Sequence, residues 1–114
     1  MLALHEWGDP TDPPLLLVHG LTESAAAWPD AVARWSSQYH VLAIDQRGHG
    51  ASPRWDDEAL ARAPQTMHED LTRTLALFPE PPVVVAYSLG GLISLRVSVA
   101  RPELVRALVL EDVA

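Results

Sequence analysis

Four short runs of aliphatic residues constrain the fold of this chain more than any other feature of its sequence. They are Leu15–Val18, Val41–Ile44, Val83–Ala86 and Ala107–Leu110. Strands with one face in water alternate apolar and polar residues, and these runs have no polar alternate. Each run is therefore expected to be a strand that is covered on both faces, and together they predict a mostly parallel sheet.

Segments with helical signals separate these runs. The first begins near Pro29, because proline suits the first turn of a helix, and continues with Val32 and Trp35 at helical spacing. The second is expected to open with a capping box in which the Thr66 hydroxyl and the Glu69 carboxylate satisfy free backbone N–H groups. Both segments fit helices that connect neighbouring parallel strands.

The third helical segment runs from about residue 88 to residue 101, where Pro102 follows and ends it. Its apolar residues Leu92, Leu95 and Val99 lie three and four positions apart, which predicts that they form the buried face. Residues 1–9 alternate weakly and fit an edge strand, whereas residues 54–64 form a charged excursion without a clear core face. Strand and helix alternate in this order in a three-layer α/β/α sandwich, with helices on both faces of the sheet.

Length and composition set further limits. A chain of 114 residues, 48% of them hydrophobic, fits one domain spanning residues 1–114. The net charge of -7 argues against nucleic acid or an anionic membrane as a partner. The chain has no cysteine, so disulfides and thiolate zinc sites are excluded. No apolar run reaches the roughly 20 residues of a membrane span, no signal peptide is recognised, and no cofactor or metal is expected. The default expectation is a cytoplasmic protein.

Polar residues follow each of the four apolar runs. In open parallel sheets, ligands bind at the carboxyl ends of the strands, so these residues are expected to share one rim. The four segments are 19–24, 45–52, 87–91 and 111–112, with the sequences HGLTES, DQRGHGAS, YSLGG and ED.

Three of these stretches together resemble a known family, the α/β-hydrolases. "LLLVHGLTES", "VLAIDQRGHGAS" and "VVVAYSLGG" are similar, in order and spacing, to the oxyanion loop, the D-x-R-G-x-G-x-S loop and the nucleophile elbow of that family. The resemblance covers residues 15 to 114, and it implies the N-terminal portion of a serine hydrolase scaffold.

In the elbow, a nucleophile stands on a tight turn between a strand and a helix. The resemblance gives that place to Ser88, with Ala86 and Gly90 as the small residues on either side. The Leu89 N–H lies at the amino end of the following helix, where a developing oxyanion is stabilised. By the family pattern the second oxyanion donor is the N–H of Leu21. Gly20, Trp28 and Tyr87 are the candidates for contact with substrate.

Structural roles remain open for several of these residues. Ser88 could serve only as a helix N-cap, a position that serine commonly takes. His19 and His49 are expected to be structural members of their loops rather than proton acceptors. Asp45 and Arg47 are expected to hold their loop by hydrogen bonds or an ion pair rather than to act on substrate.

A serine nucleophile needs a base and an orienting carboxylate. The family order is serine, acid, histidine, but all five histidines of this chain precede Ser88. Asp112 stands where some members carry the acid, and otherwise it is a solvated carboxylate at a strand end. The chain is therefore expected to be a truncated domain that hydrolyses esters weakly or not at all.

Three functions are compatible with the sequence. The first is an esterase-like serine hydrolase, or the N-terminal part of one, acting on a carboxylic ester or related acyl substrate. The second is a non-catalytic relative that binds a small molecule or a partner, and the third is a truncated reading frame without a role of its own. The run Ala107–Leu110 would leave an unpaired aliphatic sheet edge, which predicts possible self-association.

Overall fold

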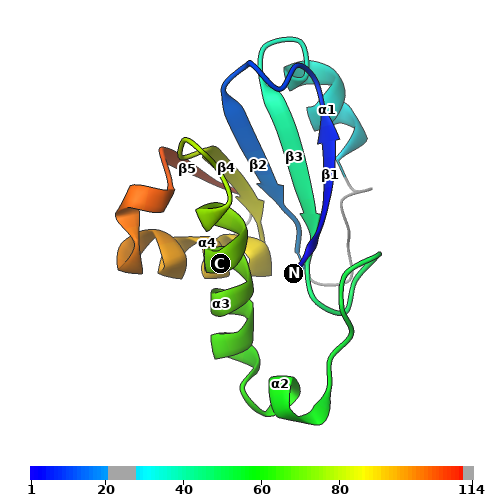
Figure 1. Ribbon diagram of the computed structural model, residues 1–114, viewed down its shortest axis with the longest axis vertical. Coiled ribbons are helices and arrows are strands. Elements are labelled where there is room, and N and C mark those ends of the chain that lie inside the picture. Colours follow the sequence, from blue (N-terminus) through cyan, green and yellow to red (C-terminus); the bar gives the residue numbers. More distant parts are fainter. Residues whose placement is uncertain (21–27, 112–114) are drawn as a thin grey trace.

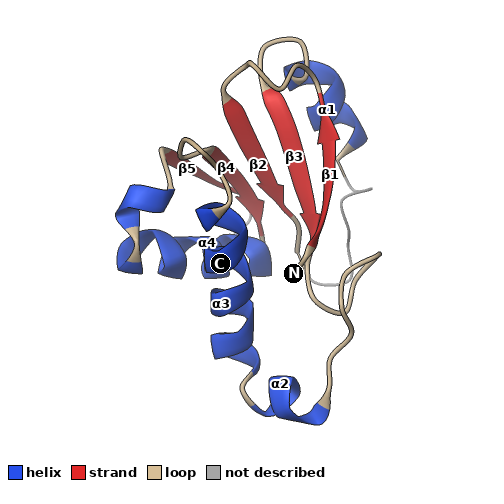
Figure 2. Ribbon diagram, in the orientation of Figure 1, coloured by secondary structure: helices blue, strands red, loops and turns tan. Residues whose placement is uncertain are grey.

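The computed structural model describes residues 1–20 and 28–111 of the chain, and it contains one five-stranded mixed sheet (Figures 1 and 2). Leu21 and Asp112 lie outside the described residues. The strands are β1 (Ala3–Trp7), β2 (Pro14–Val18), β3 (His40–Asp45), β4 (Val83–Tyr87) and β5 (Ala107–Glu111). The helices are α1 (Pro29–Trp35), α2 (Asp57–Ala61), α3 (Ala63–Ala76) and α4 (Leu89–Ala100), followed by the short 3-10 helix η2 (Pro102–Leu104).

The strand order in the sheet is β1-β3-β2-β4-β5. Strands β2 to β5 are parallel, and only β1 runs antiparallel, on the outside of β3. All four aliphatic runs are therefore strands of one mostly parallel sheet, as predicted, and residues 3–7 form the expected edge strand.

The apolar runs supply two separate cores because successive side chains of a strand point to opposite faces. On β2, Leu16 and Val18 pack into the core beneath α3 and α4, whereas Leu15 and Leu17 pack into the core beneath α1. Helices thus cover both faces of the sheet, which confirms the three-layer α/β/α arrangement.

The predicted capping box of α3 is wrong. The helix begins at Ala63, one turn earlier than expected, with Pro64 in its first turn. The Thr66 hydroxyl instead donates to the carbonyl oxygen of Ala59 at the end of α2, over 3.0 Å. The charged segment 54–64 contains α2, whose amino end is capped by the Asp56 carboxylate accepting from the Ala59 N–H. Because α2 ends at Ala61 and α3 begins at Ala63, the Thr66 hydroxyl lies beside the end of α2 and bonds to a carbonyl group there instead of capping α3.

The predicted core face of α4 is also wrong. Its buried residues are Gly90, Gly91, Ile93, Ser94 and Val97, whereas Leu92, Leu95 and Val99 are exposed, Val99 by 77%. Helical spacing identifies stripes but does not say which stripe faces the sheet. The glycines decide it, because the backbone of α4 approaches the end of β2 too closely for any side chain at residue 90.

Exposed aliphatic side chains continue on β5, the outermost strand next to β4. Val109 is 46% exposed, and Leu110 is also exposed. The apolar character that predicted a doubly covered strand is therefore present at the edge of the sheet without such a cover in the described part of the chain.

Candidate active site

The turn between β4 and α4 contains a residue with an unusual backbone conformation. Ser88 has φ 53° and ψ -122°, and it is the one non-glycine residue with a positive φ among the described residues. Such a conformation costs about 1–3 kcal/mol for a residue with a side chain, and it persists only where the surroundings enforce it. Here the strand ends at Tyr87 and the helix starts at Leu89, so one residue makes the whole change of direction.

Hydrogen bonds hold Ser88 through its backbone rather than its side chain. Its N–H donates to the carbonyl oxygen of Glu111 over 3.0 Å, and its carbonyl oxygen accepts from the Leu92 N–H over 3.1 Å. The Ser88 side chain makes no capping hydrogen bond to α4, and the residue is half-buried. The simple N-cap role of this hydroxyl is therefore not what the geometry shows.

Two glycines allow this turn to pack against the end of β2. A Cβ atom on Gly90 would lie 2.3 Å from the carbonyl oxygen of His19 and 2.8 Å from that of Val18. A Cβ atom on Gly20 would lie 3.1 Å from both the Ser88 Cβ and the Tyr87 Cδ1. The backbone after β2 thus lies directly against the Ser88 turn, as expected for two loops at the carboxyl ends of adjacent parallel strands.

His19 is fully buried and is committed to structural hydrogen bonds. Its Nε2 accepts the backbone N–H of Gln46 over 2.8 Å, so Nδ1 carries the proton of the neutral ring. That Nδ1 lies 2.6 Å from the carbonyl oxygen of Gly20 and donates to it. With both ring nitrogens engaged, His19 locks the loops after β2 and β3 together and is not available as a proton acceptor.

The Gln46 side chain strengthens the same junction. Its Nε2 donates to the carbonyl oxygen of His19 over 2.6 Å, the oxygen that closely faces Gly90. Three consecutive strand ends of the sheet therefore meet around one buried carbonyl group. The sequence identified the strand ends, but it gave no signal for this role of Gln46.

Asp45 acts within its own loop, as the sequence predicted. Its carboxylate accepts from the Ala51 N–H over 3.0 Å and lies 2.8 Å from Nε2 of His5 on β1. The Ser52 hydroxyl donates to the Asp45 carbonyl oxygen and accepts from the Ala3 N–H. The loop after β3 is thereby tied to the antiparallel edge strand.

Arg47 forms the expected ion pair, and its partner is Asp70 on α3. Two hydrogen bonds of 2.9 Å join Nε and one terminal nitrogen of the guanidinium to the two carboxylate oxygens of Asp70. These bonds raise the pKa of Arg47 above its usual value. The guanidinium carbon also lies 5.9 Å from the ring centre of Trp55, within cation–π range.

His49 lies beside the His19 ring, with 5.0 Å between the ring centroids, and its Nδ1 is 3.0 Å from the Arg47 carbonyl oxygen. Both histidines are therefore built into the loops, as expected from the sequence.

The structure brings Ser88, Leu89, Gly20 and Tyr87 together at one end of the sheet. Trp28 lies just before α1 and lines a separate cavity of about 260 Å³ that also includes Glu111. The Leu21 and Asp112 predictions fall outside the described residues and remain predictions.

The described chain contains no helix long and apolar enough to cross a bilayer.

A larger cavity, of about 430 Å³, lies elsewhere, at the amino ends of β2 and β3. The Ser88 turn does not line it.

Comparison with known proteins gives a consistent family. A sequence model of the alpha/beta hydrolase fold matches residues 13–113. An (E)-2-((N-methylformamido)methylene)succinate hydrolase of Acinetobacter baylyi is 36% identical over 93 residues, covering 82% of this chain and 35% of that protein. The lipase LipV of Mycobacterium tuberculosis is 33% identical, over 99% of this chain and 42% of its own length.

Among solved structures, a thioesterase domain from the curacin biosynthetic pathway has a TM-score of 0.87 and 28% identity, with 96% of this chain and 41% of that domain aligned. This chain spans well under half the length of these relatives. The family match, the strand order and the turn at Ser88 agree, and the chain belongs to the alpha/beta hydrolase fold family.

Proposed function

We propose that this chain carries the serine nucleophile of an enzyme that hydrolyses carboxylic esters or related acyl compounds. The observation that carries the proposal is the backbone of Ser88, which is strained at φ 53° and whose hydroxyl does not cap the helix it precedes. Relatives named as hydrolase and lipase support the reaction class. A pimeloyl-[acyl-carrier protein] methyl ester esterase, 34% identical over 83% of this chain, also supports it.

In this proposal the Ser88 Oγ attacks the acyl carbon as a base removes its proton. The carbonyl π pair moves to oxygen, and the resulting oxyanion accepts hydrogen bonds from backbone N–H groups. Leu89 is the first residue of α4, and the first N–H groups of a helix have no partner within it. The Leu89 N–H and the Leu21 N–H are the proposed donors. Loss of one such donor costs roughly 3–4 kcal/mol of transition-state stabilisation where it has been measured.

Collapse of this intermediate expels the alcohol, which takes the proton back from the base, and leaves an acyl ester on Ser88. Water then attacks that ester by the same route and releases the acid. Asp112 is the candidate to orient the base, and the base itself is the part that this chain does not supply in an obvious place. His19 is excluded because its ring nitrogens bond to Gln46 and Gly20. The proposed activity of these 114 residues alone is therefore weak, and Gly20, Trp28 and Tyr87 stay proposed substrate contacts.

Because both ring nitrogens of His19 are hydrogen-bonded, His19 cannot serve as the base. This favours one alternative, a non-catalytic relative that uses the same rim to bind a small molecule or partner. A fluorophosphonate probe separates the two functions, because it phosphonylates only an activated serine. The proposed enzyme becomes labelled at Ser88, and Ser88→Ala abolishes the label. Ser98→Ala, which removes a hydroxyl bonded within α4 to the Ser94 carbonyl, leaves labelling unchanged.

Turnover of a p-nitrophenyl ester provides the second measurement. We expect slow release of nitrophenol that is lost in Ser88→Ala and retained in Ser98→Ala. Absence of both labelling and turnover in a folded chain would support the binding module instead. Rapid turnover that survives Ser88→Ala would contradict the serine mechanism.

A further inference from the structure

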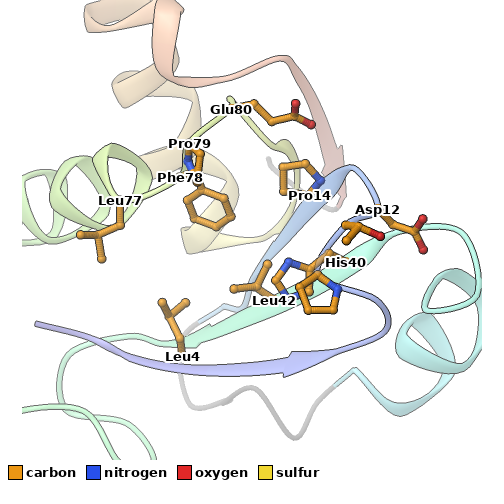
Figure 3. A pocket seen from close by; sticks show the side chains of 11 residues that line it. Leu4, Asp12, Pro14, His40, Leu42, Leu77, Phe78, Pro79 and Glu80 are labelled. Atoms are coloured by element: carbon orange, nitrogen blue, oxygen red, sulfur yellow. The ribbon is translucent and has the colours of Figure 1, made fainter.

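The cavity of about 430 Å³, whose lining Figure 3 shows, lies at the opposite end of the sheet from the Ser88 turn. Its walls come from β1, the β1–β2 turn, the amino ends of β2 and β3, and the connection from α3 to β4. Ser88 follows the carboxyl end of β4, whereas the cavity lies at the amino ends of β2 and β3, so the two sites are at opposite ends of the parallel strands. The cavity is therefore independent of the proposed hydrolase site.

Apolar side chains form one side of this cavity. Leu42 and Phe78 pack against the main core, whereas Leu4 and Leu77 are exposed large hydrophobic residues. Figure 3 shows Leu4, Leu42 and the Phe78 ring facing the same space. Aliphatic and aromatic side chains that meet in a concave surface are typical of sites for small organic molecules, which are commonly 300–1,000 Å³ in volume.

Carboxylates lie at the other side of the cavity. Asp12 and Glu80 line it from the β1–β2 turn and the α3–β4 connection, and Figure 3 shows both residues on the side of the cavity where Pro14 lies. His40 also lines it, and its Nε2 lies 2.7 Å from the Glu6 carboxylate. Among the described residues that line it, none is an arginine. The charge at this side of the cavity is therefore negative.

Both walls that carry the carboxylates are held in place by local structure. In the β1–β2 turn, the Asp9 carboxylate accepts from the N–H and the hydroxyl of Thr11, and the Asp12 N–H donates to the Asp9 carbonyl. The α3–β4 connection contains Pro79, Pro81 and Pro82, whose φ angles are fixed by their rings. A preformed wall reduces the entropy that a ligand loses by ordering the protein.

We propose that this cavity is a binding site for a small organic cation, an amine with an aliphatic or aromatic body. The apolar part of such a ligand fits against Leu4, Leu42 and Phe78, and its ammonium group lies toward Asp12 and Glu80. An uncharged ligand of the same shape would make only the apolar contacts. A carboxylate of the same shape would be repelled by the two acidic residues.

The test compares three probes of one chain length: n-hexylammonium, n-hexanol and n-hexanoate. Binding is followed by NMR titration of the full chain at low salt and mildly alkaline pH. We expect n-hexylammonium to bind with a Kd of about 1 mM, which suits a ligand of this size. The largest shifts should fall on Leu4, Leu42 and Phe78. Hexanol should bind several-fold more weakly, and hexanoate should not bind.

Variants then test the two halves of the site. The double variant Asp12→Asn/Glu80→Gln should weaken n-hexylammonium binding about tenfold and should leave hexanol binding unchanged. Leu77→Lys, which places a cation at the cavity through an exposed position, should weaken it similarly. The matched control is Asp57→Asn/Glu58→Gln on α2, which removes the same charge away from the cavity and should bind like the parent chain.

Equal binding of the three probes would overturn the proposal, because it would show that charge does not select the ligand. Shifts confined to other residues would overturn it as well. Unchanged affinity in both the double variant and Leu77→Lys would do the same.

Discussion

The carbonyl oxygen of His19 lies 2.3 Å from the point where a Cβ atom of residue 90 would stand, so Gly90 cannot be replaced without moving backbone. The carbonyl is also held from its other side by the Gln46 side chain, over 2.6 Å. The position of α4 against β2, and with it the position of Ser88, is therefore fixed by main-chain contact.

Gly90→Ala is expected to lower the free energy of unfolding by at least about 2 kcal/mol, since neither carbonyl next to it can give way cheaply. Urea unfolding followed by tryptophan fluorescence measures the change. Val99→Ala, on the exposed side of the same helix, is the control and should change stability by less than about 0.5 kcal/mol. A Gly90→Ala variant as stable as the parent would show that α4 can shift away from β2.

Ser88→Gly should raise the free energy of unfolding by about 1 kcal/mol, because glycine adopts a positive φ without strain. The matched substitution Ser98→Gly lies inside α4, where glycine is unfavourable, and it should lower stability by a similar amount. Thermal unfolding of the two variants therefore gives changes of opposite sign. If both substitutions destabilised the chain equally, residue 88 would not store backbone strain.

Asp70→Asn is expected to cost about 3 kcal/mol or more, because it leaves the largely buried Arg47 guanidinium without its charged partner. Glu69→Gln is the neighbouring control, since Glu69 pairs with Arg62 on the exposed surface. Such a pair contributes little, so its loss should change stability by less than about 1 kcal/mol. Denaturant unfolding distinguishes the two, and equal effects would contradict a structural role for the Arg47–Asp70 pair.

Thr11→Ala should raise the pKa of Asp9 part of the way back toward its ordinary 3.8. The backbone and side-chain hydrogen bonds from Thr11 lower this pKa, and the substitution removes only the second bond. A lowered carboxyl pKa stabilises the fold above the ordinary value, and that stability is lost as pH falls through the lowered pKa. NMR titration of the Asp9 side chain measures the shift. An unchanged pKa would assign the effect to the backbone bond alone.

We propose that the outer edge of β5 associates with a second copy of the chain when the chain is isolated. Sedimentation velocity should show a larger species that increases with protein concentration. Val109→Lys should reduce it, because a charged residue on an edge strand discourages pairing. Leu60→Lys replaces a leucine on α2 that is 59% exposed, compared with 46% for Val109, and should leave association unchanged. A chain that stays monomeric at high concentration would contradict this proposal.

The sheet and the rim at its carboxyl end were predictable because their signals, apolar runs followed by polar residues, lie in short continuous stretches of sequence. The aliphatic runs indicated strands covered on both faces, which describes β2, β3 and β4 but not the exposed β5. The polar residues after the runs indicated that the strand ends share one rim. The first residue of α3 was not predictable in this way, since the Thr66 hydroxyl bonds to Ala59 in α2 rather than to an N–H group of α3. The face of α4 was missed for a related reason: Leu92 and Leu95 have better apolar spacing than the glycines, but the glycines decide how closely α4 approaches β2.

The candidate site was predictable in part. The place of Ser88 in the strand-to-helix turn followed from its neighbours, and the loop-holding roles of Asp45 and Arg47 are confirmed by their hydrogen bonds. The partner Asp70 and the bond from Gln46 to His19 depend on residues more than twenty positions apart. Such contacts exist only once the sheet has brought the loops together, so no local pattern announces them.

The hydrogen bond from the Ser88 N–H to the Glu111 carbonyl oxygen joins the turn between β4 and α4 to the last residue of β5, an edge strand of the sheet. A polypeptide that added a strand beside β5 would therefore also stabilise the Ser88 turn, and one that moved β5 away would weaken this hydrogen bond. The shape of the Ser88 turn is in that sense coupled to the edge of the sheet at β5.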